Sequence, residues 1–280
     1  MKINFTLPCW ALVIAILPFF PSCSGDVVEQ KLQYDYKRDD SLPADYIREL
    51  GTFRVGMEQI AAMNESIMTE KNSYNSQLLN PSSKVSNYNN SKIQALNLGV
   101  YASDLGYAAA FYQTQDMRNY SDAIFQIAQK LGIQGAFDKD MLEKLTSADT
   151  TIDKEQMFSR AFRHLQENMH SHERSHLMAL MITGGWVESI YLASTVLKSK
   201  PLSAEMNSVL FDNAYTYQNV KKILELFQKD CKDCKEVLLE LETLNGPIEN
   251  LIVNSRYGIT QGQMDSLHSQ LVLVRGKLIS

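Results

Sequence analysis

Two long apolar segments dominate the pattern of hydrophobic and polar positions along the chain. One runs from Lys92 to Gln115, and the other forms the second half of the stretch from His164 to Leu197. Both have apolar side chains all round rather than in one stripe, which is typical of helices buried on several sides. Small residues, including Gly99 and the pair Gly184 and Gly185, would allow close packing. We therefore predict two core helices that pack against each other at their glycines.

The remaining segments have the one-sided apolar spacing of amphipathic helices. They are residues 44–70, 120–131, 138–145, a helix that opens at Asp153, and residues 203–229, 237–244 and 261–278. Gly132 is expected to end one helix, and Thr260 to cap the last. Residues 72–91 are rich in Asn and Ser and predict a loop. No strand-like alternation is found, so the predicted fold class is all-α, a single bundle-like domain of about eight helices.

A weak internal repeat links the two apolar helices. Residues 99–103 (GVYAS) and 185–189 (GWVES) have Gly and Ser at equal spacing. Two pseudo-equivalent helical halves would produce this repeat, and so would chance.

The first residues predict export and a lipid anchor. Lys2 precedes an apolar run that ends before Cys23, and Pro8 and Pro18 make a membrane-spanning helix a poor alternative. We predict a lipoprotein signal peptide over 1–22, acylation of Cys23, a polar tether over 23–42 and a helical domain over 43–280. The alternative is an ordinary secretory signal that leaves a free cysteine. The expected location is the cell envelope, on the periplasmic or the outer surface of a membrane.

The composition of the chain argues against one class of binding partner. The formal net charge is -5, and hydrophobic residues make up 45% of the chain. An acidic balance argues against nucleic acid, which requires a basic face. The membrane, through the lipid, and an unknown protein or small molecule remain as partners.

Three motifs carry a family resemblance. They are Leu98-Gly99-Val100-Tyr101, Asp104-Leu105 and Gly184-Gly185-Trp186-Val187-Glu188. With the sequence between and around them, they make the chain similar to an uncharacterised family of α-helical lipoproteins of the Bacteroidetes type. The resemblance covers most of the chain after the signal. It implies a lipid-anchored helical domain of unknown activity, and it supplies no catalytic residues.

His172, Glu173 and His176 form an HExxH motif, the only enzyme-like pattern in the chain. On a helix both histidines face one way and Glu173 could act as the base of a zinc hydrolase. Arg174 introduces a charge where such motifs usually have none, and no third ligand follows closely. We therefore expect no cofactor, with zinc as the alternative, and interpret the histidine-rich segment as a polar helix face.

Cys231 and Cys234 form the second candidate site. In an exported protein such a pair most often forms a disulfide, which is our prediction here. A redox-active dithiol, or a zinc site shared with the histidines, remains an alternative.

Asp104 and Glu188 are lone carboxylates inside the two apolar helices. A buried charge must find a partner or take up a proton. If the helices pack at their glycines, both carboxylates could line one polar ligand pocket, with Tyr101 and Trp186 as further candidates. The alternative is a purely structural set of hydrogen bonds to Tyr, Ser or Arg.

These observations favour a lipid-anchored envelope protein that is a non-enzymatic binding or interaction module. A zinc metallohydrolase that uses His172, His176 and Glu173 is one alternative. A structural or assembly protein without a ligand pocket is the other.

Overall fold

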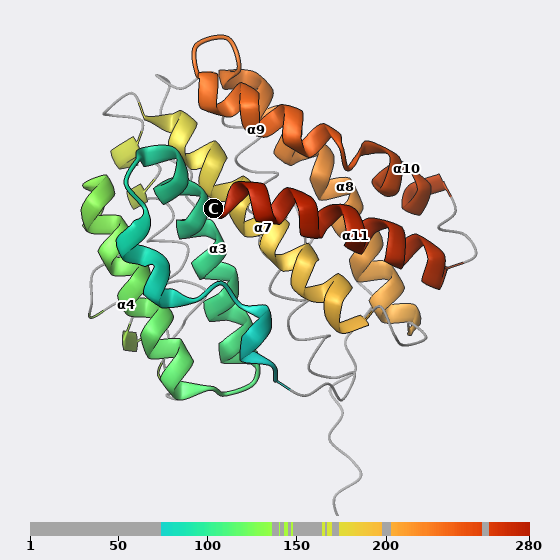
Figure 1. Cartoon of the computed structure of the whole chain (residues 1–280), viewed down its shortest axis with the longest axis horizontal. Coiled ribbons are helices and arrows are strands. Elements are labelled where there is room, and N and C mark those ends of the chain that lie inside the picture. The colour runs from blue at the N-terminus through green and yellow to red at the C-terminus, as the bar shows by residue number, and fades with distance from the viewer. Residues whose placement is uncertain are drawn as a thin grey trace, which may run out of the picture. The chain divides into compact units, whose positions relative to one another are not determined.

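Regular structure in the computed structural model is helical throughout the part of the chain that it describes, as the sequence predicts (Figure 1). The described residues are 74–135, 140, 143–144, 147, 164–165, 167–169, 174–197, 203–253 and 258–280. The predicted signal peptide, Cys23, the tether and the helices over 44–70 and from Asp153 lie outside or almost wholly outside these ranges. Most of the helix predicted over 138–145 does too.

Two short 3-10 helices precede seven α-helices in the described residues. They are η1 (Ser76–Leu78), η2 (Ser82–Asn87), α3 (Ser91–Ala110), α4 (Thr114–Leu131), α7 (Ser175–Leu197), α8 (Ala204–Phe227), α9 (Lys232–Glu242), α10 (Asn245–Val253) and α11 (Gln261–Leu278).

Local capping chemistry explains where several of these helices begin and end. Gly132 adopts a left-handed conformation with φ of 68° and ends α4. The Ser203 side chain accepts a hydrogen bond from the Met206 backbone N–H at the start of α8. Thr260 and Gln263 form a reciprocal capping box that starts α11. The ends predicted at Gly132 and Thr260 are confirmed.

Several predicted boundaries were wrong. The helix predicted over 92–115 ends at Ala110, and the one predicted over 120–131 begins at Thr114. α9 begins at Lys232 rather than near residue 237, because the Cys231 side chain caps this polar first turn. Residues 245–247 lie beyond the helix predicted over 237–244, where no further helix was predicted before 261, but they begin α10. Proline is tolerated in the first turn of a helix, where its missing N–H has no intrahelical acceptor.

α3 and α7 pack with their backbones close together at their glycines. A Cβ atom added to Gly99 would collide with the Met181 carbonyl, and one added to Gly184 would collide with the Leu96 carbonyl. Ser103 donates a hydrogen bond to the Gly185 carbonyl over 2.8 Å. The predicted contact between the two apolar helices is therefore present, and only glycine permits it.

The weak internal repeat lies at this contact. Gly99 faces Gly185, and the Ser189 hydroxyl donates to the Ser103 hydroxyl over 2.9 Å. Equivalent positions of the two repeated segments thus touch one another across the helix pair.

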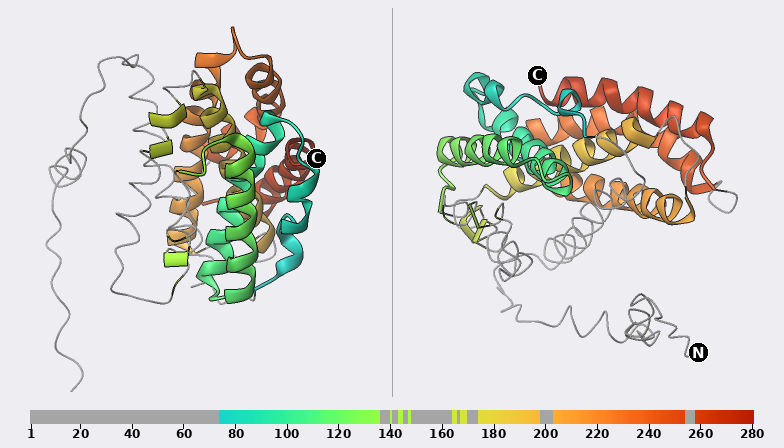
Figure 2. Two further views of the ribbon diagram at one scale, coloured as in Figure 1. Left: turned by 90° about the vertical axis from the view of Figure 1, so that its left-hand side faces the viewer. Right: turned by 90° about the horizontal axis from the view of Figure 1, so that it is seen from below.

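α7 occupies the middle of the described helices. It contacts α3 on one side and α8, α9 and α11 on the others, while α4 packs on α3 (Figures 1 and 2). By length and composition α7 is also the one described helix that could cross a membrane, but 94% of its apolar window is buried inside the protein. That burial is typical of a core helix.

Candidate functional site

Asp104 and Glu188 meet in the interior, close to the glycine contact between α3 and α7. Both residues have 0% exposed surface, and each carboxyl group lies close enough to the other to shift its pKa. The close approach of the helix backbones brings these two side chains together. The structure thus joins the two carboxylates that the sequence singles out.

Arg275 of α11 completes this site and was not among the predicted site residues. Its Nε donates to Oε2 of Glu188 over 2.5 Å, and its Nη2 donates to Oε1 over 2.7 Å. Nη2 also donates to the Leu78 carbonyl over 3.2 Å, and the guanidinium lies 4.2 Å above the Tyr191 ring. This two-pronged pairing fixes α11 and the end of η1 against α7. We call Asp104, Glu188 and Arg275 the carboxyl–arginine cluster.

Asn80 connects the cluster to the segment before α3. Its backbone N–H donates to Oδ2 of Asp104 over 3.1 Å, and its side chain donates to Asn97 and to the Tyr88 hydroxyl. The Tyr120 hydroxyl of α4 donates to the Asn80 carbonyl. The predicted loop at 72–91 is therefore anchored by buried polar contacts.

Electrostatics indicate that the two carboxyls share one proton. Burial, together with the charge of Glu188, raises the pKa of Asp104 well above its usual range. Burial also raises the pKa of Glu188, although Arg275 acts in the opposite direction. Among the described residues Oδ1 of Asp104 has no hydrogen-bond partner. A neutral Asp104 that donates to a Glu188 carboxylate held by Arg275 satisfies all three groups.

The other two predicted pocket residues have different positions. Tyr101 is buried beside the cluster, where it donates to the Pro81 carbonyl over 2.9 Å. Trp186 instead packs against Tyr217 of α8, with ring centroids 5.4 Å apart, and its Nε1 lies 3.4 Å from the Asn213 carbonyl. The cluster is thus enclosed by protein, and neither carboxyl presents a surface to solvent.

The HExxH motif is only partly described. His172 and Glu173 lie outside the described residues, while His176 is half-buried in the first turn of α7 and burial lowers its pKa. Arg174 donates to the Leu131 carbonyl over 2.6 Å, which ties this segment to the end of α4. Within the described residues no group of three possible metal ligands occurs. Zinc binding here therefore stays the alternative to a site without a cofactor.

Cys231 and Cys234 are free thiols in the structure. The Cys231 sulfur accepts a hydrogen bond from the Cys234 backbone N–H over 3.1 Å, so it acts as the cap of α9. Cys234 is buried. The disulfide predicted for this pair is not formed in the structure.

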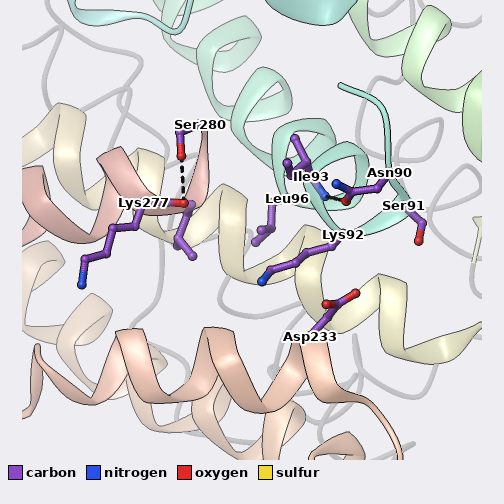
Figure 3. Close-up of a pocket in the computed structure, with 9 residues that line it drawn as sticks. Asn90, Ser91, Lys92, Ile93, Leu96, Asp233, Lys277 and Ser280 are labelled. Atoms are coloured by element: carbon purple, nitrogen blue, oxygen red, sulfur yellow. Dashed lines mark hydrogen bonds between the residues drawn. The ribbon is translucent and has the colours of Figure 1, made fainter. Parts of the chain in front are cut away.

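An open recess lies where the beginnings of α3 and α9 meet the end of α11 (Figure 3). Its volume is about 480 Å³. It is lined by Asn90, Ser91, Lys92, Ile93, Leu96, Asp233, Lys277, Leu278 and Ser280. Lys92 pairs with Glu236 and Lys277 with Glu240, both of α9 and both over 2.6 Å. The sequence analysis did not predict this recess, because it forms only where three separate helix ends converge.

Comparison of the chain with protein-family models, with curated proteins and with solved structures finds no match. The carboxyl–arginine cluster and the recess are therefore interpreted from their own chemistry.

Proposed function

We propose that this protein is a lipid-anchored component of a bacterial cell envelope whose helical domain is a non-enzymatic binding module. The apolar run before Cys23 and the resemblance to α-helical lipoproteins support the anchor. The chain's acidic balance agrees with a protein or small-molecule partner rather than nucleic acid.

The enclosure of the carboxyl–arginine cluster is the observation that carries the non-enzymatic half of the proposal. A catalytic acid or base must come within hydrogen-bonding reach of its substrate. Asp104 and Glu188 have no exposed surface, and their partners Asn80 and Arg275 belong to the protein itself. The buried charged groups of the cluster thus hold α3, α7, α11 and the segment before α3 together.

Among the described residues, the recess is the accessible surface that we propose for a partner. Its volume of about 480 Å³ lies within the range of small-ligand sites. Ile93, Leu96 and Leu278 supply apolar surface, while ammonium, carboxylate and hydroxyl groups surround them (Figure 3). Such a mixed lining favours a small polar molecule or a short polar segment of a protein.

The anchor is tested by metabolic labelling with a palmitate analogue in a bacterium that processes lipoproteins. We expect label on the wild-type chain and on Cys9→Ala, whose altered residue lies within the predicted signal, and none on Cys23→Ala. Unlabelled wild-type protein, or label that persists in Cys23→Ala, would contradict the proposal.

The binding half is tested by a photo-crosslinking amino acid placed at Ser91 in the recess. Tyr112, which is 81% exposed and does not line the recess, is the control position. We expect a discrete adduct from position 91 that is absent from position 112 and is lost when Ile93 is changed to Glu. The same adducts from both positions, or adducts unaffected by Ile93→Glu, would contradict a binding role for the recess.

A further inference from the structure

Two cysteines lie at the start of α9, three residues apart in the chain. Cys231 has an extended backbone with φ of -120° and caps the helix, and its sulfur lies 3.1 Å from the backbone nitrogen of Cys234. Residues three apart at a helix start have Cα atoms about 5 Å apart, which lies within the range that a disulfide spans. A bond between these sulfurs therefore needs only a local side-chain rotation.

The two thiols have unequal environments. Cys231 is partly exposed at the N-terminus of α9. Cys234 is 0% exposed and points its thiol toward the His176 carbonyl, 3.8 Å away. Burial and the neighbouring thiol raise the pKa of Cys234. An external reagent can thus reach Cys231 first, while Cys234 is positioned behind it.

We propose that Cys231 and Cys234 are a reversible dithiol–disulfide site that reacts with small-molecule disulfides by thiol–disulfide exchange. This inference goes beyond the proposed binding function and does not depend on it. It differs from a permanent structural disulfide, because in the reduced pair the Cys231 side chain caps α9. The Asp233 side chain between the two cysteines lines the recess, so the site adjoins that surface.

The exchange takes place in two steps. The Cys231 thiolate attacks one sulfur of the small disulfide, whose S–S bond breaks and releases one thiolate that takes a proton from water. Cys234 then loses its proton to water and attacks the Cys231 sulfur of the mixed disulfide, which releases the second small thiol. The protein dithiol is oxidised by two electrons, and the small disulfide is reduced to two thiols.

The test uses the full chain with Cys9→Ser and Cys23→Ser, so that the pair supplies its only thiols. After equilibration with excess oxidised glutathione, we expect both thiols to resist alkylation by a maleimide, with no glutathione attached by intact mass. Dithiothreitol should restore both. Cys234→Ser should retain one glutathione on Cys231. Cys231→Ser should react with an aromatic disulfide at least about tenfold more slowly than Cys234→Ser, because its remaining thiol is buried.

Three results would overturn the proposal, provided that far-UV circular dichroism shows each protein folded. The wild-type pair could remain fully alkylatable, it could keep a stable glutathione adduct, or Cys231→Ser could react as fast as Cys234→Ser. If Cys234→Ser does not fold, Cys234→Ala replaces it as the apolar variant for this buried position.

Discussion

Two cations of α11 bind glutamates at nearly the same distance in opposite environments. Arg275 lies 2.5 Å from Glu188, and their side chains are 14% and 0% exposed. Lys277 lies 2.6 Å from Glu240, and those side chains are 59% and 34% exposed. Water screens the second pair, whereas the first must satisfy its charges with protein groups alone. The environment, rather than the distance between charges, therefore determines what each pair contributes.

The buried pair also connects more elements of the fold than the exposed pair does. Burial alone would lower the pKa of Arg275, but its hydrogen bonds to Glu188 and the negative charge of Glu188 raise it overall. The guanidinium thus stays charged and joins α11 to α7 and to Leu78. Asp104 and Asn80 connect α3 and the segment before it to the same cluster. The Lys277 pair connects only α11 and α9.

The largest difference between the pairs should appear when each cation is removed. Arg275→Met leaves the Glu188 charge buried without its cation, and we expect it to reduce the free energy of unfolding by about 3–5 kcal/mol. Lys277→Met should cost less than about 1 kcal/mol, because its pair is exposed. Chemical denaturation of both variants measures the contrast. Equal losses would show that burial does not distinguish the two pairs.

The glycine contact that brings the carboxyls together gives the next largest effect. Gly184→Ala places a methyl group against the Leu96 carbonyl, and we expect a loss of about 3 kcal/mol as the helices separate. Gly276→Ala in α11 is the matched control, because a Cβ there meets no described atom within 4 Å. The control should gain up to about 1 kcal/mol from helix propensity. A Gly184→Ala variant as stable as its control would argue against close α3–α7 packing.

A smaller effect should appear in the pH dependence of stability. The pKa of Asp104 is raised in the folded state, so the folded protein binds this proton more tightly than the unfolded chain does. That contribution is complete below about pH 4 and is lost as pH rises toward the folded pKa. Relative to Asp104→Asn, wild-type stability should therefore fall with rising pH, by at most about 1.4 kcal/mol per unit. A relative gain with rising pH would contradict a raised pKa.

Much of the fold follows from local pattern. Apolar side chains all round α3 and α7 predicted two core helices, and their glycines predicted the contact between them. Thr260 and Gly132 predicted ends that the structure confirms. These features depend on residues close together in the chain, which explains why sequence reasoning finds them.

The site was harder to predict because its parts are distant in the chain. Because Asp104 and Glu188 lie within apolar helices, the sequence predicted that each carboxyl has a bonding partner or is protonated. Nothing near them in the chain identified Arg275, which is 87 residues after Glu188. The available signal for Arg275 was its position directly after the apolar run Leu271-Val272-Leu273-Val274. Trp186 was grouped with the carboxyls because it is near Glu188 in sequence, yet its ring faces α8.

The shared proton can be observed directly by carboxyl ¹³C NMR of protein labelled at aspartate, with the Asp104 signal assigned by its loss in Asp104→Asn. A proton held between Asp104 and Glu188 predicts that this signal keeps the chemical shift of a protonated acid through neutral pH. A signal that titrates near pH 4, as for an exposed aspartate, would contradict the enclosed cluster.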